Sequence, residues 1–256
     1  MSGTVREFAV GDRPEIVIAV FSTDVDVVEG SAGLITVEID GPERDRDLIE
    51  VIHDGNVVTI RSRKGGRRWL GRGPSVHLTI PASTAVTARA ASGDLRFSVP
   101  ISVAEIDVSS GDVHLASLSG RGRMKAASGD ITIGEIAGEI RISTASGDVR
   151  IDEFDGDGSI KTASGDIRIG EAQGSISVRT ASGDVTVRQF SGVMFEGVAM
   201  SGDFDIGLVS GMSIDADIQT RSGHFRNHTS PASGTGEPSI SATMRLKTLS
   251  GDVTLR

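Results

Sequence analysis

The sequence predicts an all-β fold, a single-stranded parallel β-solenoid with 18-residue coils of two short strands each and an N-terminal strand cap. Three observations lead to this prediction. The tripeptide Ser-Gly-Asp recurs at a fixed interval, and apolar residues alternate with polar ones between its copies. In addition, no segment has the pattern of a long amphipathic helix.

The tripeptide marks the period of the repeat. Further copies and one variant, Ser222-Gly223-His224, follow the regular series at wider intervals, beginning at Ser201 and Ser250. Because glycine adopts positive φ without a Cβ clash, we expect every copy to form a corner of the chain. The copies spaced by 18 residues begin at Ser92, Ser110, Ser128, Ser146, Ser164 and Ser182.

Each repeat unit predicts two strands. The unit at 164–181, SGDIRIGEAQGSISVRTA, divides into two halves that read x-Gly-x-apolar-x-apolar-x-x-apolar. This alternation is typical of a short strand with one buried face, and Gly165 and Gly174 fall where the chain must turn. The half-period disfavours a left-handed hexapeptide helix, and the single Asp per unit disfavours a calcium-binding roll.

Stacked coils would align their apolar side chains in rows that share one core. Within one coil we expect Gly158 to make room for Phe154, as close packing requires. The three predicted rows, in the order of the chain, are Leu95, Val113, Ile131, Val149, Ile167, Val185, Phe204 and Phe225; Phe97, Leu115, Ile133, Ile151, Ile169, Val187 and Ile206; and Leu118, Ile136, Phe154, Ala172 and Phe190.

We expect one continuous domain with two parts. Residues 1–90 form an irregular, strand-rich leader and the first coils, and residues 91–256 form the regular solenoid with a surface insertion near 226–239. In the leader, residues 21–27 resemble a degenerate repeat unit, and HDGNVVTI at 53–60 predicts a hairpin.

Composition excludes several classes of function. The formal net charge of −9 argues against nucleic-acid binding. The absence of Cys excludes disulfides, thiolate catalysis and Cys-ligated zinc, and we expect no cofactor. No apolar segment is long enough to span a membrane and no signal peptide is seen, so we expect a soluble cytoplasmic protein.

The repeated aspartates are the first candidate site. Stacking would place their carboxylates about 4.8 Å apart, where like charges repel. We expect each carboxylate to be stabilised by backbone N–H groups of its own turn. The alternative is a ladder of bound cations, which would involve Asp112, Asp130, Asp148, Asp166 and Asp184.

Two irregular segments are candidate partner contacts. The first is a basic insert with one tryptophan, for which a solvated hairpin tip is the simpler interpretation. The second is the end of the repeat, where a histidine replaces the recurring aspartate before the insertion. The candidate residues are Arg61, Arg63, Lys64, Arg67, Arg68, Trp69, Arg72, His224 and His228.

The chain resembles a bacterial β-strand-repeat family of adhesin-like proteins, a domain-of-unknown-function family with toast-rack and auto-transporter-head-like relatives. The resemblance lies in the (T/A)ASGDVxI units, in VHLTIPAS at 76–83 and in LKTLSGDVTLR at 246–256. It extends over residues 15–256, and it implies the solenoid fold without any shared catalytic residues.

These observations favour a non-catalytic binding or adhesin-like scaffold that presents a repetitive face to a protein or a cell-envelope polymer. One alternative is a structural scaffold that polymerises end to end through its coils, that is, a homo-oligomer. A carbohydrate-active β-helix enzyme is less favoured, because a residue present in every coil serves the coil rather than one active site.

Overall fold

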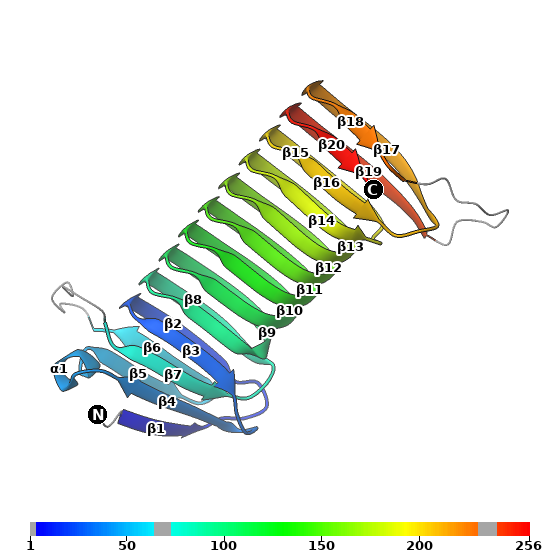
Figure 1. The fold of residues 1–256 in the computed structure, drawn as a ribbon. Coiled ribbons are helices and arrows are strands. Elements are labelled where there is room, and N and C mark those ends of the chain that lie inside the picture. The colour runs from blue at the N-terminus through cyan, green and yellow to red at the C-terminus, as the bar shows by residue number, and fades with distance from the viewer. Residues whose placement is uncertain (1–3, 64–72, 230–239) are drawn as a thin grey trace. The chain divides into compact units, whose positions relative to one another are not determined.

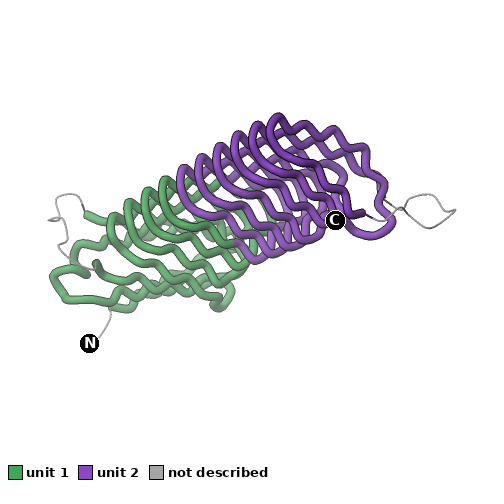
Figure 2. Tube along the Cα trace, turned by 45° about the horizontal axis from the view of Figure 1, so that its top comes forward, with its two compact units in different colours: residues 1–132 green, residues 133–256 purple. Residues whose placement is uncertain are grey.

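The computed structural model describes residues 4–63, 73–229 and 240–256. Most of them lie in strands, and the only helix among the described residues is α1 (Glu43–Arg46) (Figure 1). The contacts divide the chain into two compact units, residues 1–132 and 133–256, and each is considered by itself (Figure 2). The predicted boundary near residue 90 stays a prediction.

The regular coils are long strands that pair in parallel. In the second unit every residue of β12 that is paired faces the residue 18 positions later in β13. The two short strands predicted for a coil run on as one bent strand of 16 residues, because Gly156 and Gly174 remain paired at the corner with positive φ. These strands are β9 (Leu95–Ser110), β10 (Val113–Ser128), β11 (Ile131–Ser146), β12 (Val149–Ser164) and β13 (Ile167–Ser182).

The first coil comes from the leader. It consists of β2 (Glu15–Ser22) and β3 (Asp24–Glu29), which run parallel to β8 (Thr84–Ser92) and to β9. The degenerate unit predicted at residues 21–27 is therefore part of a genuine coil, and β8 brings the chain back beside it after an excursion of the leader.

That excursion covers the other side of the first coil. There β2 pairs with β6 (Val57–Ser62) and β3 pairs with β7 (Ser75–Ile80), both in parallel. Antiparallel strands continue from them and confirm both the predicted cap and the predicted hairpin. These strands are β5 (Ile49–Asp54) beside β6, β4 (Leu34–Asp40) beside β7, and β1 (Thr4–Ala9) beside β4.

The last coils of the second unit do not stack in the order of the chain. β19 lies between β15 and β17, and β20 lies between β16 and β18. The predicted row that passes directly from Phe204 to Phe225 is therefore wrong, because Val253 pairs with both. The strands concerned are β14 (Val185–Phe190), β15 (Met194–Ser201), β16 (Phe204–Leu208), β17 (Met212–Ser222), β18 (Phe225–Asn227), β19 (Ile240–Ser250) and β20 (Val253–Leu255).

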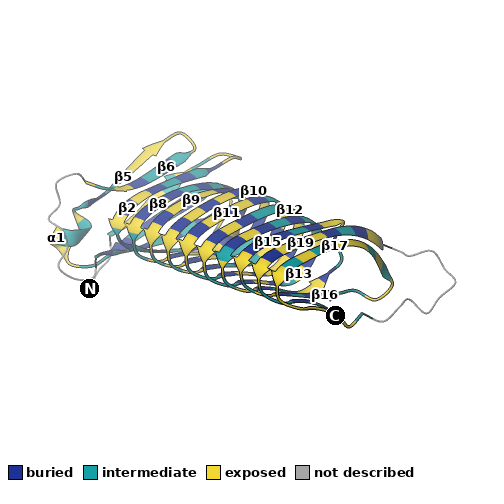
Figure 3. Cartoon of the chain, turned by 90° about the horizontal axis from the view of Figure 1, so that it is seen from above, coloured by how far each residue is buried: buried dark blue, intermediate teal, exposed yellow. Residues whose placement is uncertain are grey.

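The predicted apolar rows lie in the core of each unit except at Phe225, and buried and exposed residues alternate along the strands (Figure 3). Volumes are matched between positions, as the sequence suggested. A Cβ added to Gly158 would lie 2.8 Å from Cζ of Phe154, so the phenylalanine ring fills the space that a side chain at 158 would need. In the next coil, Ala172 pairs with Phe154 and Ile176 pairs with Gly158, so the large and the small residue exchange positions.

This exchange of volume predicts a compensating pair of substitutions. Gly158→Ile alone should lower the free energy of unfolding by about 3 kcal/mol, because the added side chain overlaps the ring of Phe154. The double change Phe154→Ala/Gly158→Ile copies the neighbouring coil and should recover most of that loss. Urea unfolding of the three proteins measures the difference, and a double variant no more stable than Gly158→Ile would contradict this packing.

Candidate binding face

The recurring aspartates form a hydrogen-bonded ladder in each unit. In the second unit, the Asp166 N–H donates to Oδ1 of Asp148 at 2.8 Å, and the Asp184 N–H donates to Oδ1 of Asp166 at 2.9 Å. In the first unit, Asp24, Asp94 and Asp112 accept in the same way from the following coil. The expected hydrogen bond within the aspartate's own turn is therefore wrong, because the carboxylate reaches the next coil instead.

Each carboxylate takes the place of a backbone carbonyl at the corner. The reverse bond is made by the backbone itself, since the Val149 N–H donates to the Asp166 carbonyl at 2.9 Å. Together the two bonds keep the backbone groups paired where the strand bends. The repeated aspartate thus continues the hydrogen bonding of the sheet from coil to coil.

Arginine side chains also stabilise the ladder. Arg168 donates to Asp148 at 3.0 Å and to Asp166 at 2.6 Å, and its hydrogen bond to Asp148 raises the pKa of the Arg168 guanidinium. At the last rung, the His224 N–H and then the Arg226 guanidinium lower the pKa of the Asp252 carboxyl. This contribution to stability is present above the ordinary pKa of an aspartate and is lost as the pH falls through the lowered value.

The cation ladder has no support in the described residues. No group of three or more acidic or histidine side chains in residues 4–63, 73–229 and 240–256 lies close enough together to hold a metal ion. The ladder that Asp112, Asp130, Asp148, Asp166 and Asp184 would form is instead built from carboxylate-to-backbone bonds wherever its contacts are described.

The ladder predicts a graded response to substitution. Asp184→Ala removes the acceptor of the Asp203 N–H, a bond of 2.8 Å, and should lower the free energy of unfolding by about 1 kcal/mol. Asp184→Asn keeps an oxygen acceptor and should cost less. Asp155→Ala removes an exposed carboxylate outside the ladder and is the control, expected within about 0.5 kcal/mol of the parent protein. Equal effects of Asp184→Ala and Asp155→Ala in chemical unfolding would refute the role of the ladder.

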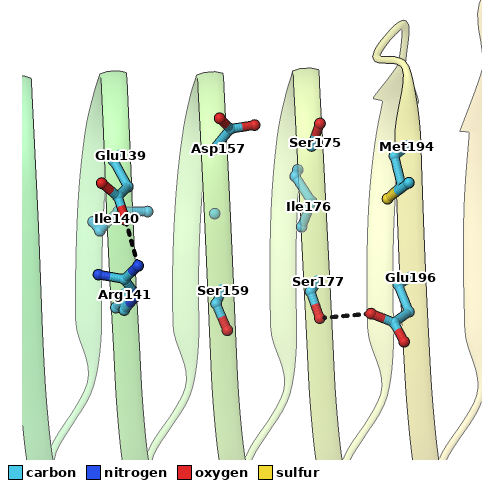
Figure 4. Close-up of a pocket in the computed structure, with 11 residues that line it drawn as sticks. Glu139, Ile140, Arg141, Asp157, Ser159, Ser175, Ile176, Ser177, Met194 and Glu196 are labelled. Atoms are coloured by element: carbon cyan, nitrogen blue, oxygen red, sulfur yellow. Dashed lines mark hydrogen bonds and ion pairs between the residues drawn. The ribbon is translucent and has the colours of Figure 1, made fainter.

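The outer face of the second unit has a shallow hollow of 220 Å³ (Figure 4). Its middle is formed by Asp157, Ser159, Ser175 and Ser177, which pair across β12 and β13 and carry short side chains. Larger side chains border it, Glu139 and Arg141 on one flank and Met194 and Glu196 on the other. The hollow therefore exists because small outward residues in two adjacent coils lie between larger ones.

Three of the four residues that border this hollow, Glu139, Arg141 and Glu196, are charged and form ion pairs. Arg141 pairs with Glu139 on the same strand. Glu196 accepts from the Ser177 hydroxyl at 3.3 Å and from Arg179 at 3.4 Å. These charged groups are thus held in place by one another before any ligand binds. The short serines between them leave the hollow open (Figure 4).

A second hollow of 600 Å³ opens on the same face, over β15, β19 and β17. Side chains alternate along β15, so Val198 and Met200 point outward as Met194 and Glu196 do. Met200 is 59% exposed and Leu249 on the adjacent strand is 51% exposed. Gln219, Arg221 and Lys247 also line this hollow, which therefore combines exposed apolar side chains with polar and charged ones.

None of the predicted contact residues that the structure describes lines either hollow. Arg61 on β6 donates to Glu50 at 2.8 Å, and the Arg63 N–H donates to the Leu48 carbonyl at 2.7 Å. His224 lies at the last corner, where its N–H donates to Asp252, and His228 follows β18 with an exposed side chain. The remaining predicted residues, Lys64, Arg67, Arg68, Trp69 and Arg72, lie outside the described residues.

The residues of the two hollows were missed in the sequence. One signal could have found Met200 and Leu249, because each is an apolar residue at an outward position of a period-2 strand. The corresponding positions of earlier coils are Ala145, Ala163 and Ala181. For Ser159, Ser175 and Ser177 the sequence carries no such signal, since serine is common at exposed positions and only its neighbours make the hollow.

Comparison with known proteins identifies the family. A family model described as Toastrack DUF4097 matches residues 14–256, so the chain belongs to that family. This confirms the resemblance in the repeat and the solenoid it implied. No curated protein matches the chain.

Several solved structures match the chain, among them three from Bacteroides and Parabacteroides species. A "putative adhesin" from Bacteroides fragilis is 12% identical, with a TM-score of 0.43 over 100% of this chain and 97% of that chain. A "putative lipid binding protein" and a "putative adhesin" from Parabacteroides distasonis are 16% and 14% identical, with TM-scores of 0.45 and 0.44. The two matches extend over 100% and 99% of this chain, and over 97% of each of those two chains.

Proposed function

We propose that this member of the Toastrack DUF4097 family is a non-catalytic, adhesin-like binding module. Its partner is an extended chain, a protein segment or a cell-envelope polymer, that lies along the outer face of the second unit. The observation that carries the proposal is the open polar hollow formed in register by adjacent coils, with Ser159 and Ser177 at its centre.

The shape of the face supports an extended partner. Outward residues recur once per coil along parallel strands, so equivalent positions form straight rows across β12, β13 and β15. A row of this kind offers similar contacts at regular intervals, and a linear partner can use several of them at once. A compact small molecule would use only one position.

The chemistry of the face supports polar recognition. Glu139, Arg141 and Glu196 carry charges of both signs around serine hydroxyls. Hydroxyl and carboxylate groups of this kind bind sugar hydroxyls and peptide N–H groups, while Arg141 binds carbonyl or anionic oxygens. The exposed Met200 and Leu249 extend the face with apolar contact area.

The proposal is tested by filling the polar hollow. Ser159→Trp/Ser177→Trp places two large side chains in it and should reduce co-sedimentation of the protein with the insoluble envelope fraction of its source cells by about tenfold. Thr186→Trp places the same side chain at a partly exposed outward position of β14 and should leave binding unchanged.

Thermal unfolding of each variant confirms that the fold is retained. No binding by the parent protein, or equal binding by the parent and the double variant, would rule out this face as the site of envelope binding. No helix in the described part of the chain is long and apolar enough to cross a membrane.

A further inference from the structure

The last coil of the second unit is open on one side. β17 pairs with β19 along one edge, and β18 pairs with β20, but neither has a strand partner on its other edge among the described residues. Figure 1 shows both strands as the outermost ones of this unit. An edge of this kind presents free N–H and C=O groups that can pair with another strand.

The apolar core is also uncovered there. Phe225 is 48% exposed, whereas Val253 and Phe204, its neighbours in the same row, are 0% and 1% exposed. Along β17 the core-facing Ile214 and Ile218 are only half-buried. The last coil thus lacks the covering that every interior coil receives from its neighbour, which leaves both hydrogen bonds and apolar contacts unmade.

The charged residues of β17 are complementary to those of a second β17 strand that runs antiparallel to it. Asp215 and Arg221 lie three residues before and after Ile218, on the outward face, and both are exposed. Neither forms an ion pair with a described residue. If two copies of β17 pair antiparallel with Ile218 opposite Ile218, Asp215 of each lies opposite Arg221 of the other, and opposite charges in such cross-strand pairs are stabilising.

The same register suits the other residues of the strand. Asp217 lies opposite Gln219 of the second copy, and within one chain the Gln219 amide already donates to the Asp217 carboxylate at 3.1 Å. Shifting the register by one residue in either direction would place outward residues opposite inward ones less favourably and separate Asp215 from Arg221. A shift by two residues would pair Asp217 with Arg221 but leave Asp215 opposite Gly223, whereas the register centred on Ile218 gives a partner to both Asp215 and Asp217.

We propose that the last coil is the interface of a symmetric dimer, in which β17 pairs antiparallel with β17 of a second copy, centred on Ile218. The first coil of the chain does not offer the same surface, because β6 and β7 and the antiparallel strands beyond them already cover it. Two uncovered coils therefore meet each other, and the contact closes as a two-fold dimer instead of continuing as a polymer.

Residues 230–239 of the same chain are less suited than a second β17 to cover this edge, because of their composition. Residues 230–239, SPASGTGEPS, contain two prolines, which have no N–H to donate, and no large apolar side chain to pack on Phe225. A second β17 brings both a complete set of backbone groups and Ile218.

The experiment exchanges the two charges. Asp215→Arg and Arg221→Asp each place like charges opposite each other twice per dimer, so each variant alone should dimerise about tenfold more weakly or worse. Asp215→Arg/Arg221→Asp restores opposite charges and should dimerise like the parent. Asp217→Asn, opposite Gln219, is the matched control and should change little. Sedimentation velocity over a concentration series measures all four.

Mixing the two single variants tests the pairing of Asp215 with Arg221 most specifically. A chain with Arg at 215 and 221 should pair with a chain with Asp at both positions, so the mixture should form a heterodimer that neither variant forms with itself. Thermal unfolding confirms that each variant is folded.

Three outcomes would overturn the proposal. One is a parent protein that stays monomeric up to about 1 mM. Another is a species that keeps growing with concentration, which would mean open-ended assembly. The third is a dimer indifferent to the exchange of charge, which would place the contact elsewhere. Envelope binding through the Ser159 hollow is measured separately, so either result stands without the other.

Discussion

The close approach of the backbones at the Ser-Gly-Asp corners is the constraint on which the structure depends. A Cβ added to Gly165 would lie 2.2 Å from the Gly147 carbonyl oxygen, and one added to Gly183 would lie 2.1 Å from the Gly165 carbonyl oxygen. Both glycines have φ of +131°, which L side chains rarely adopt. Glycine at this position is therefore required twice, by the conformation of its own backbone and by the coil stacked on it.

The aspartate and the apolar rows follow from this corner. Because adjacent corners are so close, the Asp166 N–H lies within reach of the Asp148 carboxylate, and the side chain replaces the backbone carbonyl that the bend moves away. The same spacing keeps the strands in register over a whole coil, so that side chains of equal position pack in rows. Outward residues then also form rows, and the binding face and its hollows are a consequence of the same period.

Much of this arrangement could be predicted from the sequence. The 18-residue period determines the corners, and the alternation within it determines which side of each strand is buried. Even the matched volumes of Phe154 and Gly158 are visible in one repeat. The degenerate unit at residues 21–27 and the hairpin at 53–60 could be recognised because each keeps a local pattern despite its irregular surroundings.

The rest depends on contacts that a repeat cannot specify. The insertion of β19 and β20 between earlier strands was missed because every copy of the unit fits beside every other. The aspartate hydrogen bond was misassigned because an N–H in its own turn and one in the next coil are equally plausible partners in the sequence. The hollow around Ser177 depends on the sizes of side chains in neighbouring coils, and Asp215 and Arg221 gain meaning only once β17 is known to be an edge.

The most direct test of the central constraint is the stability of Gly165→Ala beside that of Gly55→Asn. Gly55 also has positive φ, at +58°, but a Cβ there would meet nothing within 4 Å, and asparagine tolerates this conformation. The account predicts that Gly165→Ala lowers the free energy of unfolding by about 3 kcal/mol or more, while Gly55→Asn changes it by less than about 1 kcal/mol. Losses of similar size in the two variants, measured by urea unfolding, would contradict the claim that the stacked corners determine this fold.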